Sequence, residues 1–352
     1  MNHLTGLTLA AAVPLFVVGC SNNDDDGSPP APAVATASDV DGDVARQWLD
    51  LVYEVVRAES LSPPIASRAY GYAGVAFYEA VVDGIPDRRS VGGQLNGLAA
   101  LPGATAGVHD WKLAANAAMG RFLADFFATG SQGSLDDIAA LEADLHAMLS
   151  ASLPQAVVDR SVAHGETVAD SISAWRATDD FNLHNNCGYV VPVPGGGAWE
   201  PTPPDFAAPL QPCWGAMRCF ALVDGTDCAP LGPPAFETDP LSQFYSQALE
   251  VYAVTANLTP EQLAIADFWA DGPGSTGTPA GHWLRILSQI SAQEDLSLAI
   301  TAEAFAKIGI GMADAFISCW NNKYLVNLLR PVTYIQAEID PTWTSPIGTP
   351  PF

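Results

Sequence analysis

Apolar residues recur every three to four positions along most of the chain, a spacing that places them on one face of an α-helix. Trp48, Leu51 and Val55 form such a face in the first of these segments, residues 44–59. The same spacing predicts helices over residues 65–82, 108–128, 134–151, 155–177, 239–254, 260–270, 280–292 and 295–328. No strand pattern separates them, so the sequence predicts an all-α, multi-helix bundle.

The predicted helix 65–82 differs from the others because it is apolar on most of its sides. It is rich in alanine and glycine, and small residues let neighbouring helices approach closely. Tyr70, Tyr72 and Phe77 would fill the gaps around it. A helix of this composition is expected at the centre of a bundle.

Residues 1–20 have the features of an export signal. Residues 4–18 are apolar but too short to span a bilayer as a stable anchor. The run ends in Val17-Val18-Gly19-Cys20, which resembles a bacterial lipobox with Cys20 as the lipidated residue. The alternative is an ordinary secretory signal with a chance cysteine. We expect a lipoprotein of the bacterial cell envelope, on its periplasmic or surface side, held at the membrane by lipid alone.

The next segment, residues 21–43, is predicted to be a disordered tether. It begins with a run of asparagine and aspartate and continues with proline- and alanine-rich sequence. Such a segment cannot bury enough apolar area to fold. The folded domain is therefore expected to cover residues 44–352.

Residues 181–236 are predicted to be a long irregular segment rich in cysteine, proline and glycine, with at most a short hairpin. In an oxidising compartment its four cysteines favour disulfides, with three pairings possible. A metal site is less favoured, because no paired Cys-x-x-Cys or histidine spacing accompanies them. The four candidates are Cys187, Cys213, Cys219 and Cys228, while Cys319 lies in a helical pattern and is predicted to be a buried free thiol.

The charge of the chain narrows the kinds of ligand that it can bind. It has 39 Asp and Glu residues against 14 Lys and Arg, a formal net charge of −25. Such a surface repels phosphate backbones, which argues against nucleic-acid binding. An anionic ligand would need a local cluster of the few cations, so a place where two of them converge is informative.

Lys323 and Arg330 form such a pair in the last predicted helix. Seven residues are close to two helical turns, so both side chains would point the same way, roughly 10 Å apart along the axis. Pro331 is expected to end the helix directly after Arg330. A guanidinium fork and an ammonium group together suit a tetrahedral oxyanion. The alternative is a solvent-facing pair at a helix end.

The pattern Lys-x6-Arg-Pro, from Lys323 to Pro331, resembles the first signature of a superfamily. This superfamily unites the vanadium-dependent haloperoxidases and the type 2 phosphatidic acid phosphatases (PAP2). The surroundings resemble the bacterial haloperoxidase branch over residues 44–352, with gaps. The segments that carry this likeness include Ser62-Pro63-Pro64, Arg68-Ala69-Tyr70, Gly281-His282-Trp283 and Asp340-Pro341-Thr342-Trp343.

The resemblance implies a helical bundle of the haloperoxidase and acid phosphatase type. It implies vanadate as the cofactor, with Lys323 and Arg330 as its oxyanion ligands, and the oxidation of a halide by hydrogen peroxide in the presence of an organic substrate. An acid phosphatase of the PAP2 type is the alternative, because the same two cations would bind phosphate. His282 is a possible neighbour of the site, although a structural role at a helix start is favoured.

The sequence departs from the family pattern in its catalytic residues. The family's Ser-Gly-His motif and its later arginine and axial histidine do not occur in the 352 residues. Two charge-assisted contacts contribute about 3–6 kcal/mol, whereas association costs about 4–15 kcal/mol. The domain is therefore expected to be truncated before the Ser-Gly-His motif and inactive unless a second polypeptide completes it. A further alternative is a non-catalytic, lipid-anchored helical binding module.

Overall fold

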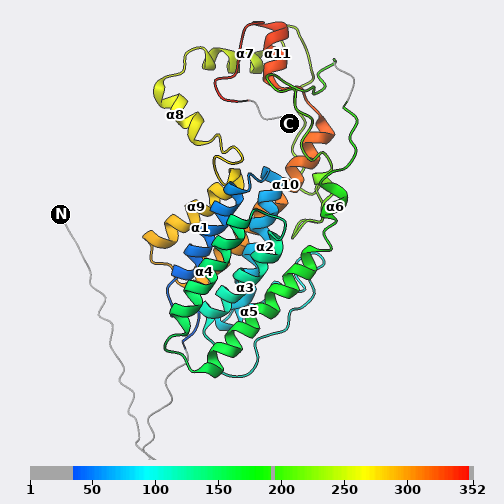
Figure 1. Cartoon of the computed structure of the whole chain (residues 1–352). Helices are drawn as coiled ribbons and strands as arrows, with labels where there is room; N and C mark the ends of the chain where they lie inside the picture. Colours follow the sequence, from blue (N-terminus) through cyan, green and yellow to red (C-terminus); the bar gives the residue numbers. More distant parts are fainter. Residues whose placement is uncertain (1–34, 192–194, 349–352) are drawn as a thin grey trace, which may run out of the picture. The chain divides into compact units, whose positions relative to one another are not determined.

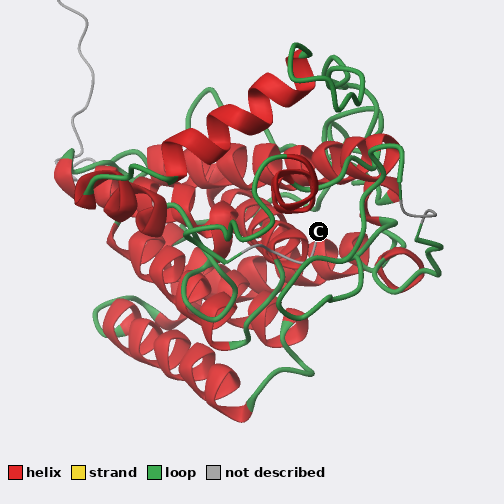
Figure 2. Ribbon diagram, turned by 90° about the horizontal axis from the view of Figure 1, so that it is seen from above, coloured by secondary structure: helices red, strands yellow, loops and turns green. Residues whose placement is uncertain are grey.

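The computed structural model describes residues 35–191 and 195–348. Within these residues it contains α-helices, two short 3-10 turns and no strand, which confirms the predicted all-α fold (Figure 2). The helices are α1 (Asp43–Ala58), α2 (Pro63–Val81), α3 (Trp111–Phe126), α4 (Gln132–Ser150), α5 (Gln155–Arg176), α6 (Phe181–His184), α7 (Gln243–Thr255), α8 (Pro260–Phe268), α9 (Thr278–Gln293), α10 (Leu298–Val326) and α11 (Pro331–Glu338). Among the described helices, none combines the length and the apolar character that crossing a membrane requires.

Helix α2 lies at the centre of the bundle that α1 to α5, α9 and α10 form (Figure 1). Every residue of α2 except Ile65 is buried. A Cβ atom added at Gly74 would lie 2.8 Å from the Phe305 carbonyl oxygen, and one added at Gly309 would lie 2.6 Å from that of Tyr70. The backbones of α2 and α10 thus approach more closely than larger residues would allow, as the small-residue pattern predicted.

The last part of the expected tether, residues 35–42, packs against the bundle. Ala37 is fully buried, and its backbone N–H donates to the Gly84 carbonyl at 2.8 Å. The backbone N–H groups of Leu298 and Ala299, at the start of α10, donate to the carbonyls of Val40 and Ala37. The prediction of disorder over residues 21–43 is therefore wrong for its last part. The predicted signal peptide (residues 1–20), Cys20 and residues 21–34 lie outside the described residues.

The segment between α5 and α7 is irregular, as predicted, and its described part contains no hairpin. One disulfide forms, between Cys187 and Cys213. The wider expectation of disulfides is wrong for Cys219, which is a buried free thiol, and for Cys228, which is an exposed one. Cys319 is exposed on α10, so the prediction of a buried thiol there is also wrong. Burial raises the pKa of the Cys219 thiol to about 12, which keeps it protonated.

Asp314 of α10 ties this irregular segment to the bundle. Its carboxylate is buried and accepts hydrogen bonds from three consecutive backbone N–H groups. The donors are Phe220 at 2.6 Å, Ala221 at 2.7 Å and Leu222 at 2.9 Å. A single side chain therefore accepts from three backbone amides that would otherwise lie against α10 without a hydrogen-bond partner.

A buried ion pair joins α2 to the end of α5. Asp179 accepts from Arg68 Nε at 2.6 Å and from the Tyr72 hydroxyl at 2.9 Å. The side chains of Arg68 and Asp179 are 6% and 3% exposed, so water contributes little to their solvation. Arg218 donates in turn to the Tyr72 hydroxyl at 2.7 Å, which extends the network into the irregular segment.

Helices α7 and α11 pack on each other beyond the end of α10 (Figure 1). Their contact is an aromatic cluster, formed by Phe236, Phe244 and Tyr334. The ring centroids of Phe244 and Tyr334 are 5.0 Å apart, and those of Phe236 and Phe244 are 5.4 Å apart. Through Tyr334, one of the three buried residues of α11, this aromatic cluster helps to position the helix.

Two buried histidines lie between α3 and α5. His109 and His164 are 5% and 7% exposed, and their ring centroids are 6.0 Å apart. The Nε2 atom of each is buried without a hydrogen-bond partner in the described part of the chain. Burial lowers the pKa of His164; the carboxylate of Asp83 opposes this shift, and the nearby His109 adds to it.

This lowered pKa predicts a loss of stability on acidification. The unfolded chain takes up a proton near the ordinary histidine value of 6.5, while folded His164 does so only at lower pH. The free energy of unfolding should therefore fall as the pH drops below about 6.5. The variant His164→Gln should lose part of this slope in urea titrations between about pH 7.5 and about pH 5. The control His146→Gln, on α4, should keep the full pH dependence of the free energy of unfolding. An unchanged pH dependence in His164→Gln would show that His164 does not cause it.

Candidate functional site

The two predicted oxyanion ligands lie on either side of a helix end rather than on one helix. Helix α10 ends at Val326, and Asn327 follows in the left-handed region at φ 51°. Arg330 has an extended backbone and precedes Pro331, the first residue of α11. The predicted helix over residues 295–328 is confirmed to within three residues, whereas the prediction that this helix ends at Pro331, with Arg330 at its carboxyl end, is wrong. Asparagine tolerates the left-handed conformation, and proline favours the first helical position.

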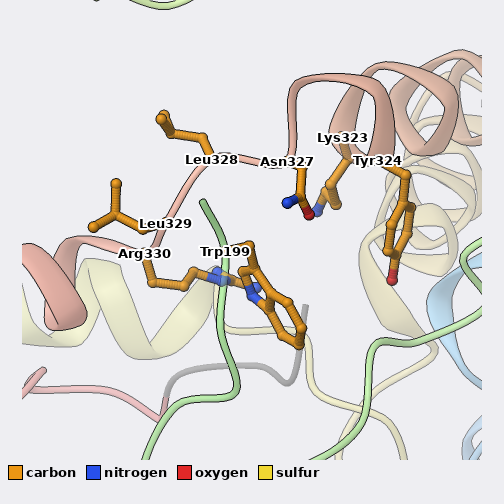
Figure 3. A pocket seen from close by; sticks show the side chains of 7 residues that line it. All are labelled: Trp199, Lys323, Tyr324, Asn327, Leu328, Leu329 and Arg330. Atoms are coloured by element: carbon orange, nitrogen blue, oxygen red, sulfur yellow. The ribbon is translucent and has the colours of Figure 1, made fainter. Parts of the chain in front are cut away.

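Lys323 and Arg330 nevertheless meet at one cavity of about 210 Å³. Its lining residues are Trp199, Lys323, Tyr324, Asn327, Leu328, Leu329 and Arg330, which we call the oxyanion cavity. Figure 3 shows the Arg330 side chain reaching toward Trp199, with Leu328 and Leu329 directed away from it. The predicted pair of cations is thus brought together by the break between the helices.

A further polar group that lines the oxyanion cavity is the indole of Trp199. This residue is 6% exposed, and its Nε1 atom is buried with no hydrogen-bond acceptor among the described residues. Its backbone N–H donates to the Asn327 carbonyl at 2.8 Å, and Leu329 N–H donates to the Gly197 carbonyl at 2.9 Å. This short bridge holds residues 197–199 beside the linker between α10 and α11. A buried donor that lacks an acceptor indicates a place for an acceptor-rich ligand.

The electrostatics of the oxyanion cavity favour an anion. Burial lowers the pKa of Lys323, the nearby Cys319 opposes this shift, and the positive charge of Arg330 adds to it. Burial also lowers the pKa of Arg330, against the opposing influence of Tyr324. Helix α11 begins directly after Arg330, and a helix amino end carries partial positive charge. A bound anion would therefore stabilise the charged forms of both side chains, Lys323 and Arg330.

Comparison with known proteins identifies the family. No protein-family model matches the chain, and no curated protein matches it. A crystal structure described as that of the first bacterial vanadium-dependent iodoperoxidase is similar to it, with 32% sequence identity and a TM-score of 0.79. The likeness covers 89% of this chain and 76% of that chain. The chain belongs to the bacterial vanadium-dependent haloperoxidase family.

The oxyanion cavity of this haloperoxidase-family chain fits a vanadate-like ion. Such an ion offers only oxygen acceptors, and the cavity offers the ammonium of Lys323, the guanidinium of Arg330 and the indole N–H of Trp199. Sequence reasoning found the two cations but missed Trp199. Its position depends on the bridge from residues 197–199 to residues 327–329, and the only local signal was a tryptophan next to a run of glycines.

His282, the possible site neighbour, does not line the oxyanion cavity of this haloperoxidase-family chain. Its Nδ1 atom lies 3.0 Å from the Asp271 carboxylate, and its ring stacks on Trp269 with centroids 4.5 Å apart. It thus belongs to the packing around the first turn of α9. No histidine is among the described residues that line the cavity. In residues 35–191 and 195–348, no three His, Cys, Asp or Glu residues gather in a group that could hold a metal ion.

Proposed function

We propose that this chain binds vanadate at Lys323, Arg330 and Trp199 and serves in the oxidation of a halide by hydrogen peroxide. The observation that carries the proposal is the pair of partly buried cations on one small cavity, in a chain of the haloperoxidase family. The similar crystal structure is described as an iodoperoxidase, so iodide is the halide that we propose. When bound, vanadate would supply the Lewis acidity that makes peroxide a stronger oxidant toward halide.

The chain's own residues would hold the oxyanion and neutralise its charge. Lys323 and Arg330 would each give charge-assisted hydrogen bonds to its oxygens, and the Trp199 indole would add a neutral one. The anion would in turn favour protonated Lys323, whose pKa is lowered by burial and by Arg330. The linker between α10 and α11 would set the distance between the two cations.

We further propose that the remaining catalytic groups come from another polypeptide segment. No Ser-Gly-His occurs in residues 1–352. Two charged contacts and one neutral one contribute about 4–7 kcal/mol, which barely exceeds the lower end of the cost of association. The 352 residues by themselves should therefore bind vanadate only weakly, with a dissociation constant of roughly millimolar size, and should not turn over halide.

Vanadate binding tests the assignment directly. Lys323→Gln and Arg330→Gln should each weaken binding about 10- to 100-fold, because a charge-assisted hydrogen bond contributes about 1.5–3 kcal/mol. Trp199→Phe keeps the ring and loses the donor, so it should weaken binding about fivefold. Titration calorimetry and vanadium NMR line broadening measure these affinities. Lys307→Gln removes the same charge from the exposed side of α10 and serves as the control.

Equal binding by the native chain and by Arg330→Gln would refute the site. Orthophosphate should compete with vanadate, because it presents the same tetrahedral oxygens. Iodide oxidation with vanadate and peroxide, assayed after a segment bearing the Ser-Gly-His motif is supplied, distinguishes a haloperoxidase from a PAP2-type phosphatase. Release of phosphate from a monoester, with no iodide oxidation, would favour the phosphatase.

We also propose that the protein is an exported lipoprotein of the bacterial envelope. The support is the apolar run of residues 4–18 followed by Gly19-Cys20, which lies outside the described residues. Mass determination of the amino-terminal peptide from native cells tests this proposal. A peptide that begins at a lipid-modified Cys20 would support it, and an unmodified peptide that retains residues 1–19 would overturn it.

A further inference from the structure

A second cavity, of about 890 Å³, shares Lys323 with the oxyanion cavity. It lies between α10, the start of α2 and the loop that leads into α9. Its lining differs from that of the oxyanion cavity, because aromatic rings and carboxylates accompany Lys323 and Arg330 is absent from it. Phe316 and Trp320 of α10 form an aromatic wall, and Asp267 and Asp271 supply the carboxylates. We call this space the acceptor cavity.

The aromatic wall is held in one orientation. The ring centroids of Phe316 and Trp320 are 5.5 Å apart, and the Trp320 indole N–H donates to the Leu210 carbonyl at 3.0 Å. Lys323 Nζ lies 4.6 Å from the centroid of the Trp320 ring. A planar ring that packs against this wall would therefore lie next to the side chain that also borders the oxyanion cavity.

The lining of the acceptor cavity also includes two carboxylates. Asp267, in the last turn of α8, is exposed, whereas Asp271 is 7% exposed and is bonded to His282. Both carboxylates belong to a chain with a net charge of −25. The two carboxylates outnumber Lys323, the one cation in the described lining, so the environment near Asp267 favours a cationic group over an anionic one. Of the two carboxylates, Asp267 has no side-chain hydrogen bond to another described residue, so it is the one open to a ligand.

The loop beside the acceptor cavity is strained. Asp271 and Thr278 have φ angles of 33° and 66°, a region that residues other than glycine seldom occupy. Thr278 is fully buried, and its hydroxyl has no hydrogen-bond partner in the described part of the chain. Such conformations persist only where the surroundings impose them, and they cluster at ligand sites.

We propose that the acceptor cavity binds the organic acceptor of the oxidised halogen, and that this acceptor is a small aromatic compound with a protonated amino group. The ring would pack against Phe316 and Trp320, and the ammonium would lie at Asp267. The identity of the reaction rests on the proposed function. In the transfer, hypoiodous acid gives its iodine to a ring carbon, and the ring proton leaves with the hydroxide as water (ArH + HOI → ArI + H₂O).

Binding to the full chain in the absence of vanadate tests the proposal. Tyramine, p-cresol and 4-hydroxyphenylacetate share one ring and differ in charge. Titration calorimetry should give tyramine about five- to tenfold tighter binding than 4-hydroxyphenylacetate. Asp267→Asn should weaken tyramine by the same factor and leave p-cresol unchanged. Phe316→Leu should weaken all three ligands, and Glu250→Gln, which removes one exposed charge from α7, should change none of them.

The outcomes separate the cavity from the reaction. Asp267-dependent binding of tyramine, in a protein that never oxidises iodide when completed, would keep the acceptor cavity and overturn the proposed function. Iodide oxidation without saturable tyramine binding would support the proposed function and overturn the acceptor cavity. Binding of tyramine that is equally strong in Asp267→Asn would overturn the assigned class of ligand.

Discussion

Replacing Asp314 with alanine is expected to lower the free energy of unfolding by about 3–6 kcal/mol. The reason is that its buried carboxylate accepts from three backbone N–H groups, those of Phe220, Ala221 and Leu222, which the variant would leave without an acceptor. The hydrogen bonds that hold residues 220–222 to α10 would then be lost, while the packing of Trp214 and Met217 on α10 would remain. Urea unfolding followed by tryptophan fluorescence measures the change.

Two further variants sharpen this expectation. Asp314→Asn keeps one oxygen and should be less destabilised than Asp314→Ala. Asp205→Asn alters an exposed carboxylate in the same irregular segment and should stay within about 0.5 kcal/mol of the native chain. A loss below about 1 kcal/mol in Asp314→Ala would mean that water replaces the carboxylate, and that Asp314 does not hold the segment.

Asp179→Ala should cost about 3–5 kcal/mol, because it would strand the buried guanidinium of Arg68 without its counter-ion. The Tyr72 hydroxyl would lose the same acceptor. The net contribution of the ion pair to the free energy of unfolding can be smaller than this cost of removing one partner. The double variant Arg68→Met with Asp179→Leu removes both charges and should be more stable than Asp179→Ala alone.

The comparison of these variants decides what the ion pair does. If the double variant is as unstable as Asp179→Ala, the loss comes from packing and from Tyr72 rather than from an unpaired charge. If the double variant has a free energy of unfolding close to that of the native chain, the ion pair adds little stability, and its role would be to specify the fold. Chemical denaturation at neutral pH measures both variants under the same conditions.

The sequence predicted the features of the fold that depend on local pattern. The central place of α2 follows from a run of small and apolar residues, and the predicted helices of the bundle agree with the structure to within a few residues. The pairing of Cys187 with Cys213 could not be predicted, because it depends on how an irregular segment folds back on itself. The burial of Ala37 could not be predicted either, because its hydrogen-bond partners, Gly84 and Ala299, are distant from it in the sequence.

For the site, the sequence predicted the residues but not their geometry. Lys323 and Arg330 line one cavity, yet not because they share a helix face. A single residue, Asn327, turns the chain between them, and a helical pattern does not reveal where a left-handed residue will end it. Trp199 was missed because it reaches the cavity only through the bridge to residues 327–329.

The break at Asn327 also makes the spacing of the two cations adjustable. On one continuous helix that spacing would be fixed by the helical repeat, whereas here it depends on the tilt of α11. The aromatic cluster of Phe236, Phe244 and Tyr334 sets that tilt, and Phe236 also packs against Gly197, two residues before Trp199. One group of rings outside the cavity therefore helps to position two of its donors, Arg330 and Trp199. If the cavity binds an oxyanion as proposed, the size that it accepts would depend on the packing between α7 and α11 as well as on the ligands themselves.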